Sequence, residues 1–120
     1  MTTNEEAEQG ATVAAEAWLA LIDRGEIAES WRQAATLFKA AVTEEQWQAA
    51  LAAAASPLGK PLSRVLKSAQ YVDELPGAPD GEYVVIEYAT AFERKRNGTE
   101  TITPMRDPDG VWRVSGYFIR

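Results

Sequence analysis

Three charged residues in the C-terminal half of the chain have the type and spacing to do chemistry in an apolar interior. Arg64, Glu100 and Arg106 lie in segments where polar and apolar residues alternate. Because successive side chains of a strand point to opposite faces, this alternation places all three on the face that carries Ile102. A lone charge is costly to bury, so such residues either pair with one another or contact a ligand.

Two interpretations of this charged group stay open. In the first, Arg64, Glu100 and Arg106 bind a small anionic or polar ligand, and the hydroxyl of Tyr88 is a further donor. In the second, Arg64 and Glu100 form an internal bidentate ion pair, which is the geometry that arginine favours. The remaining arginine then extends to the rim of the interior.

The composition excludes several kinds of site. The 120 residues include no cysteine and no histidine, so disulfides, thiolate ligands and the commonest general base and metal ligand are absent. The formal net charge of -6 opposes nonspecific binding to nucleic acid, which depends on neutralising phosphates. No apolar stretch approaches the roughly 18 residues of a membrane span. We therefore expect no metal, no cofactor, no nucleic-acid partner and no membrane insertion.

The chain divides near Pro57 into a helical half and a strand half. Residues 1–10 are polar and acidic and are expected to form either a frayed tail or the lead-in to a helix. Apolar residues then recur at three- and four-residue spacing, which predicts helices over 11–23, 26–41 and 43–56. A capping box formed by Thr43 and Gln46 begins the third helix. Alternation and turn formers predict strands over 61–73, 82–95, 99–106 and 111–119, with Asn97-Gly98 as a two-residue hairpin turn.

The predicted fold is a single α+β domain over residues 11–120. Its three helices pack on the concave face of a curved four-stranded antiparallel sheet. Alternation assigns two sets to this concave face: Val84, Ile86, Tyr88, Thr90 and Phe92, and Trp112, Val114, Gly116 and Phe118. A one-residue bulge would reverse such an assignment. The tryptophans at 18, 31, 47 and 112 are expected to fill the core. The alternative that at least one of them lines a residual pocket stays open.

The opposite positions form an apolar patch on the convex face of the sheet. Exposed patches of this kind usually mark partners, so we expect a homodimer through this face. The patch consists of Tyr83, Val85, Val111, Tyr117 and Ile119.

Several segments together resemble the bacterial domain-of-unknown-function family 4019. They are AAEAWLALIDRG and FKAAVTEEQWQAAL in the first half, then LGKPLSRVLKSAQY, LPGAPDGEYVVIEY and ETITPMRDPDGVWRVSGYFIR in the second. The resemblance covers roughly residues 11–120 and implies a cystatin-like or nuclear-transport-factor-2-like cone. Many relatives begin with an export signal, which MTTNEEAEQG does not resemble. The protein is expected to be exported or periplasmic if the chain is a mature or trimmed form, and otherwise cytoplasmic.

The resemblance does not decide the function, because the family has no settled activity and its superfamily includes enzymes, transport factors and assembly domains. The leading hypothesis is a non-enzymatic domain that binds a small anionic or hydrophobic molecule in the cone or has an accessory role. The alternative is an isomerase, cyclase or hydrolase of ketosteroid-isomerase type, which needs a carboxylate base in a dry pocket. Asp23, Glu87 and Glu100 are the plausible bases. We expect Asp23 to be solvated at a helix end, and alternation places Glu87 outside.

Overall fold

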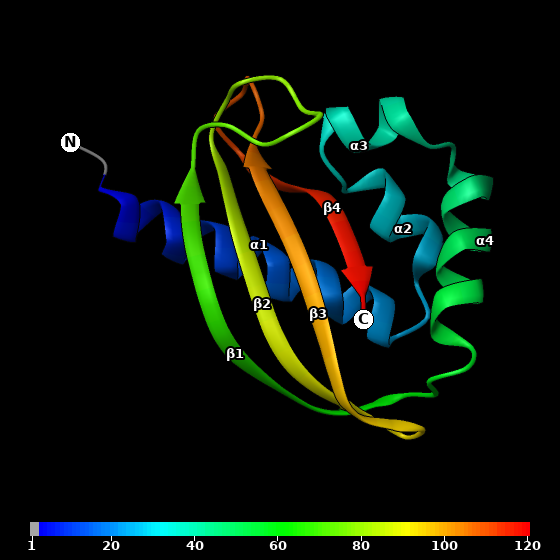
Figure 1. The fold of residues 1–120 in the computed structure, drawn as a ribbon. Coiled ribbons are helices and arrows are strands. Elements are labelled where there is room, and N and C mark those ends of the chain that lie inside the picture. The colour runs from blue at the N-terminus through cyan, green and yellow to red at the C-terminus, as the bar shows by residue number, and fades with distance from the viewer. Residues whose placement is uncertain (1–2) are drawn as a thin grey trace.

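The computed structural model describes residues 3–120 and confirms the α+β fold. Within this range the helices come first and the strands follow (Figure 1). The helices are α1 (Asn4–Asp23), α2 (Ile27–Arg32), α3 (Thr36–Ala41) and α4 (Glu44–Ala55). The strands are β1 (Pro61–Val72), β2 (Tyr83–Phe92), β3 (Lys95–Arg106) and β4 (Trp112–Ile119).

The strands form one antiparallel sheet in the order β1-β2-β3-β4, so β1 and β4 are its edges. Figure 1 shows the strands curving, with α1 crossing behind the sheet and α2, α3 and α4 grouped beside β4. α1 contacts all four strands, and α3 packs on β4. The helices therefore cover one face of the sheet, as the sequence predicts.

The first helix begins before residue 11, because residues 4–10 are helical and form its lead-in rather than a tail. The hydroxyl of Thr3 caps the helix by accepting from the backbone N–H of Glu6. Ala7 is buried, and a Cβ added at Gly10 would lie 3.3 Å from the Trp112 ring. Small residues thus let this polar segment pack closely on the sheet. Residues 1 and 2 of the expected tail lie outside the described residues.

The second predicted helix is interrupted, and it forms α2 and α3 instead of one element. Between them, the backbone N–H of Ala35 donates to the carbonyl of Val114 on β4 at 2.8 Å. The break between α2 and α3 therefore supplies a hydrogen-bond donor to a backbone carbonyl of the edge strand β4. The predicted capping box of α4 is confirmed, since Thr43 and Gln46 each bond the other's backbone N–H through their side chains.

The predicted hairpin turn at Asn97-Gly98 is wrong, because both residues lie inside β3. Phe92 pairs with Lys95, so the turn consists of residues 93 and 94. The Arg94 guanidinium donates to the carbonyls of Ser56 and Pro57, which fixes the turn against the end of α4. A tertiary anchor has overridden the local preference of Asn-Gly.

Gly98 has a packing role in place of the predicted turn role. A Cβ at this position would lie 2.7 Å from the ring of Phe92. Only glycine leaves room for that ring beside β3.

A bulge in β4 divides the strand into two parts of opposite orientation. Thr103 pairs with Gly116 and Pro104 pairs with Val114, so Ser115 is the extra residue. Before the bulge, Trp112 and Val114 face the helices as predicted. After it the predicted orientation is reversed: Tyr117 packs into the core, and Phe118 is 55% exposed.

An aromatic cluster fills the space between the helices and β4. Trp18, Phe38, Trp47 and Tyr117 lie with ring centroids 5.1–6.4 Å apart, most of them edge to face. Trp31 and Trp112 pack against the same core from its periphery. The four tryptophans are core residues, as the sequence predicts.

Candidate functional site

A charged network crosses the concave face of the sheet. Arg64 of β1 and Glu100 of β3 form the bidentate pair of the second interpretation, with Nε–Oε1 at 2.6 Å and Nη2–Oε2 at 3.1 Å. The two residues lie on opposite sides of β2, whose Thr90 donates to Oε1 of Glu100 at 2.5 Å. The hydroxyl of Tyr117 donates to Oε2. Each carboxylate oxygen of Glu100 therefore accepts two hydrogen bonds.

The network continues from Arg64 to the end of α1. Nη1 and Nη2 of Arg64 donate to the carboxylate of Asp23 at 3.0 and 3.3 Å. Asp23 is exposed at the helix end, as predicted, and it is also a partner of the network. Tyr88 lies beside this group and donates to Glu16 of α1 at 3.3 Å. Arg64 is held between two carboxylates, one buried and one at the surface.

The contacts set the protonation states of the network. Burial alone would raise the pKa of the Glu100 carboxyl, but the hydrogen bonds from Arg64, Thr90 and Tyr117 outweigh it and lower the pKa below its usual value. Burial, and then the charge of Glu100, raise the pKa of the Tyr117 hydroxyl. Burial and the nearby Glu16 raise the pKa of Tyr88 in the same way. Glu100 is therefore ionised and both phenols are protonated at neutral pH.

Arg106 does not join this network, contrary to the first interpretation. It lies six residues further along β3, where its guanidinium carbon sits 5.9 Å from the centroid of the Trp112 ring. It also pairs with Glu82 at 3.6 Å and donates to the carbonyl of Gly110. Alternation predicted the face of Arg106 correctly, but the structure places this residue at the opposite end of the sheet from Arg64 and Glu100.

The expected convex patch is also changed. Tyr117 and Ile119 follow the bulge, so they lie on the same side as Glu100, with which Ile119 pairs. Tyr83 is fully buried, and its hydroxyl donates to the carbonyl of Pro79 in the β1–β2 loop. Val85 keeps its convex position, and Val111 is exposed just before β4. Glu87 lies on the convex side as predicted and pairs with Arg120 at 3.2 Å.

An uncharged pocket of about 490 Å³ opens between the helices and β4. Phe38, Trp47 and Tyr117 of the aromatic cluster line it, together with residues 77 and 78 of the β1–β2 loop. Its other lining residues are Leu37, Ala41, Val42, Ala50, Ser115 and Gly116. Tyr117 thus contacts the pocket with its ring and the charged network with its hydroxyl. A pocket lined by a tryptophan was left open by the sequence, but its location and the role of Tyr117 were missed, because the bulge at Ser115 that turns Tyr117 inward has no local sequence signal.

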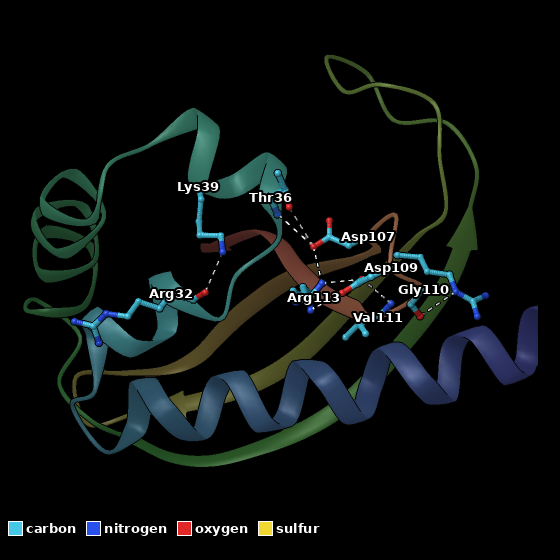
Figure 2. Close-up of polar contacts among 9 residues, drawn as sticks. Arg32, Thr36, Lys39, Asp107, Asp109, Gly110, Val111 and Arg113 are labelled. Atoms are coloured by element: carbon cyan, nitrogen blue, oxygen red, sulfur yellow. Dashed lines mark hydrogen bonds and ion pairs between the residues drawn. The ribbon is translucent and has the colours of Figure 1, made fainter.

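A second polar cluster lies at the other end of β4. Figure 2 shows Asp107 and Asp109 of the β3–β4 turn converging on Arg113. Asp107 contacts Arg113 at 2.9 Å, Asp109 contacts it at 2.8 Å, and Asp107 accepts from the backbone N–H of Thr36 at 3.4 Å. The turn is therefore attached to the first residue of α3. Within residues 3–120 no group of acidic side chains is arranged to hold a metal ion.

Fold and site together define an α+β domain in which one curved antiparallel sheet encloses an aromatic core and an internal ion-pair network. The comparison with family models gives a match over residues 14–117 to a family described as protein of unknown function (DUF4019). The chain therefore belongs to the DUF4019 family. Comparisons with curated proteins and with solved structures give no match. None of the helices within residues 3–120 combines the length and apolar character that crossing a membrane requires.

Proposed function

We propose that the protein binds a small, neutral, apolar molecule in the pocket between α3, α4 and β4. The observation that carries this proposal is the aromatic lining of an uncharged pocket of about 490 Å³. Ligand pockets of proteins commonly measure about 300–1,000 Å³ and are lined mainly by apolar and aromatic side chains. The arrangement of helices against the concave face also accords with the cystatin-like cone that the sequence resemblance implies.

The chemistry of the lining selects the class of ligand. Phe38 and Trp47 are largely buried yet contribute to the pocket, so a planar or aliphatic body can contact aromatic rings without disturbing the core. Among the described lining residues none is charged, so an ionic ligand would lose hydration without gaining a partner. The net charge of -6 further disfavours an anion.

The charged network supports this function indirectly. Arg64 already pairs with two carboxylates, so it offers no free charge to an anionic ligand. Glu100 is a poor general base, because its ionised form is stabilised by four hydrogen bonds. The network instead holds the Tyr117 ring at the pocket. These contacts favour binding over the carboxylate-base alternative.

Two fluorescent probes of similar shape test the charge selectivity. N-phenyl-1-naphthylamine is neutral, whereas 1-anilinonaphthalene-8-sulfonate adds a sulfonate to the same ring system. We expect saturable binding of the neutral probe and at least tenfold weaker binding of the sulfonate. Equal or stronger binding of the sulfonate would contradict the proposal, and so would the absence of saturable binding of the neutral probe.

A pair of substitutions on α4 localises the binding. Ala50 lines the pocket and is exposed, so Ala50→Phe should fill the pocket and weaken the neutral probe at least tenfold. Ala53 is an exposed alanine of the same helix outside that pocket, which makes Ala53→Phe the matched control. If both variants bind the probe like the wild type, the pocket is not the site.

A further inference from the structure

The edge of the sheet formed by β1 is open along most of its length. Within the described part of the chain, residues 61–70 make no backbone hydrogen bonds beyond their ladder with β2. Only near the end of the strand is an outward group satisfied, where the N–H of Tyr71 donates to Glu8 of α1 at 3.0 Å. A 12-residue edge of this kind is a template for pairing with another strand.

α1 extends beyond this edge and provides a floor for an added strand. Its 20 residues measure about 30 Å, whereas four strands at about 4.8 Å spacing span only about 15 Å. Figure 1 shows the N-terminal part of α1 projecting past β1. We call this projecting surface the α1 shelf and define it by Glu5, Glu8, Gln9, Thr12 and Val13.

The α1 shelf and β1 line a shallow, open groove of about 490 Å³ whose surface is mostly apolar. Val13 on the shelf is 70% exposed and Leu66 on β1 is 45% exposed, and both line this groove with Ala69. Leu62, also on β1, is 55% exposed. Large apolar side chains gathered beside a free strand edge indicate a surface that is covered in an assembly.

The distribution of charge along this edge identifies the occupant. Where β1 ends, the α1 shelf contributes the carboxylates of Glu5 and Glu8. Where β1 begins, Lys60 precedes the strand and the basic segment 94–96 lies in the adjacent hairpin, so basic side chains outnumber the one carboxylate of that hairpin, Glu93, which accepts from the backbone N–H of Lys60 at 2.8 Å. A two-fold axis that pairs β1 with a second β1 in antiparallel orientation brings each acidic end onto a basic end.

We propose that two copies of this chain associate through antiparallel pairing of their β1 strands, each strand resting on the α1 shelf of the other copy. The axis lies near Leu66, so Leu62 of each copy reaches the other's groove and the two sheets join into one. This interface differs from the expected convex patch. Because it uses neither the pocket nor Tyr117, it does not depend on the proposed ligand.

The association is expected to be weak. β1 and the shelf supply fewer residues than the roughly 20–30 per partner of a standard interface. The two Lys67 side chains, at the bulge between Leu66 and Ser68, also approach each other near the axis. We therefore expect the dimer to have a dissociation constant in the micromolar range, so the average molecular mass must be measured over a range of protein concentrations.

Sedimentation equilibrium between 5 and 500 µM tests the proposal. The wild type should change from monomer to dimer in this range. Leu66→Glu places a charge in the groove at an exposed position, so it should leave the circular dichroism spectrum unchanged and weaken the dimer at least tenfold. Phe118→Glu, at the similarly exposed convex position, is the matched control and should dimerise like the wild type.

Three outcomes would overturn the proposal. The first is a monomeric wild type at 500 µM, and the second is a dimer that Phe118→Glu disrupts. The third is a dimer that survives Leu66→Glu, which would leave the edge to another partner such as an extended peptide. Cross-linking gives an independent readout because the chain has no cysteine. Under mild oxidation Leu66→Cys should form a disulfide dimer, and Phe118→Cys should not.

Discussion

Glu100→Gln is the substitution that tests the internal network most severely. The carboxylate accepts two hydrogen bonds from Arg64 and one each from Thr90 and Tyr117, and its side chain is 1% exposed. An amide replaces one accepting oxygen with an N–H₂ donor that faces other donors. It also removes the charge that neutralises Arg64.

The magnitude follows from what remains around Arg64. Removing one partner of a buried ion pair typically costs about 3–5 kcal/mol. Arg64 keeps its two hydrogen bonds to Asp23, and its side chain is 18% exposed. We therefore expect Glu100→Gln to lower the free energy of unfolding by about 3 kcal/mol, at the lower end of that range. In a domain of this size this loss corresponds to a fall in Tm of roughly 10 °C.

The assay is equilibrium unfolding in urea at pH 7, with two comparison variants. Arg64→Met should also destabilise, because it leaves Glu100 charged and buried. The double variant Arg64→Met with Glu100→Leu should recover much of the loss, since an apolar pair leaves no unpaired charge. If the free energies of unfolding of Glu100→Gln and Arg64→Met both lie within about 1 kcal/mol of the wild-type value, the network is solvated and the prediction is refuted.

Three further predictions concern pH, glycine packing and the turn at α3. Because the pKa of Glu100 is lower in the folded state, its ionised carboxylate stabilises the fold above the unfolded pKa of about 4.3. This stabilisation is lost as the pH falls through the folded pKa. Urea midpoints measured at decreasing pH should therefore fall less in Glu100→Gln than in the wild type. Gly98→Ala should cost about 1–3 kcal/mol because its Cβ would overlap the Phe92 ring, whereas Gly116→Ala, whose Cβ meets nothing closer than 4.0 Å, should be close to neutral in the same melts. Asp107→Ala should cost about 1 kcal/mol, because it removes the buried carboxylate that accepts hydrogen bonds from Thr36 and Arg113. Equal stability of the variant in thermal melts would show that the turn does not hold α3.

The overall fold was predictable because its signals are local and repeated. Alternation in β2 and three- and four-residue spacing in the helices each extend over many residues, so single deviations do not hide them. The capping box of Thr43 and Gln46 was predictable because it depends only on residues within one turn of the helix. The pair of Arg64 with Glu100 followed from strand alternation and the cost of burying a lone charge.

The errors arose where distant contacts decide local structure. The hairpin turn moved away from Asn97-Gly98 because Arg94 bonds the end of α4, 37 and 38 residues earlier in the chain. The orientation of Tyr117 depends on the bulge at Ser115, and one extra residue reverses every side chain beyond it. The pocket depends on that reversal, so alternation alone could not have located it.

The central claim, that a neutral apolar ligand binds between α3, α4 and β4, is tested most directly by the indole N–H signals of the tryptophans. The chain has four tryptophans, so a ¹H–¹⁵N spectrum gives four such signals, which single Trp→Phe variants assign. Trp47 lines the pocket, whereas Trp112 lies against α1 and Arg106. Titration with N-phenyl-1-naphthylamine should shift the Trp47 signal saturably and leave that of Trp112 in place. A saturable shift of Trp112 without one of Trp47, or no shift at all, would contradict the account.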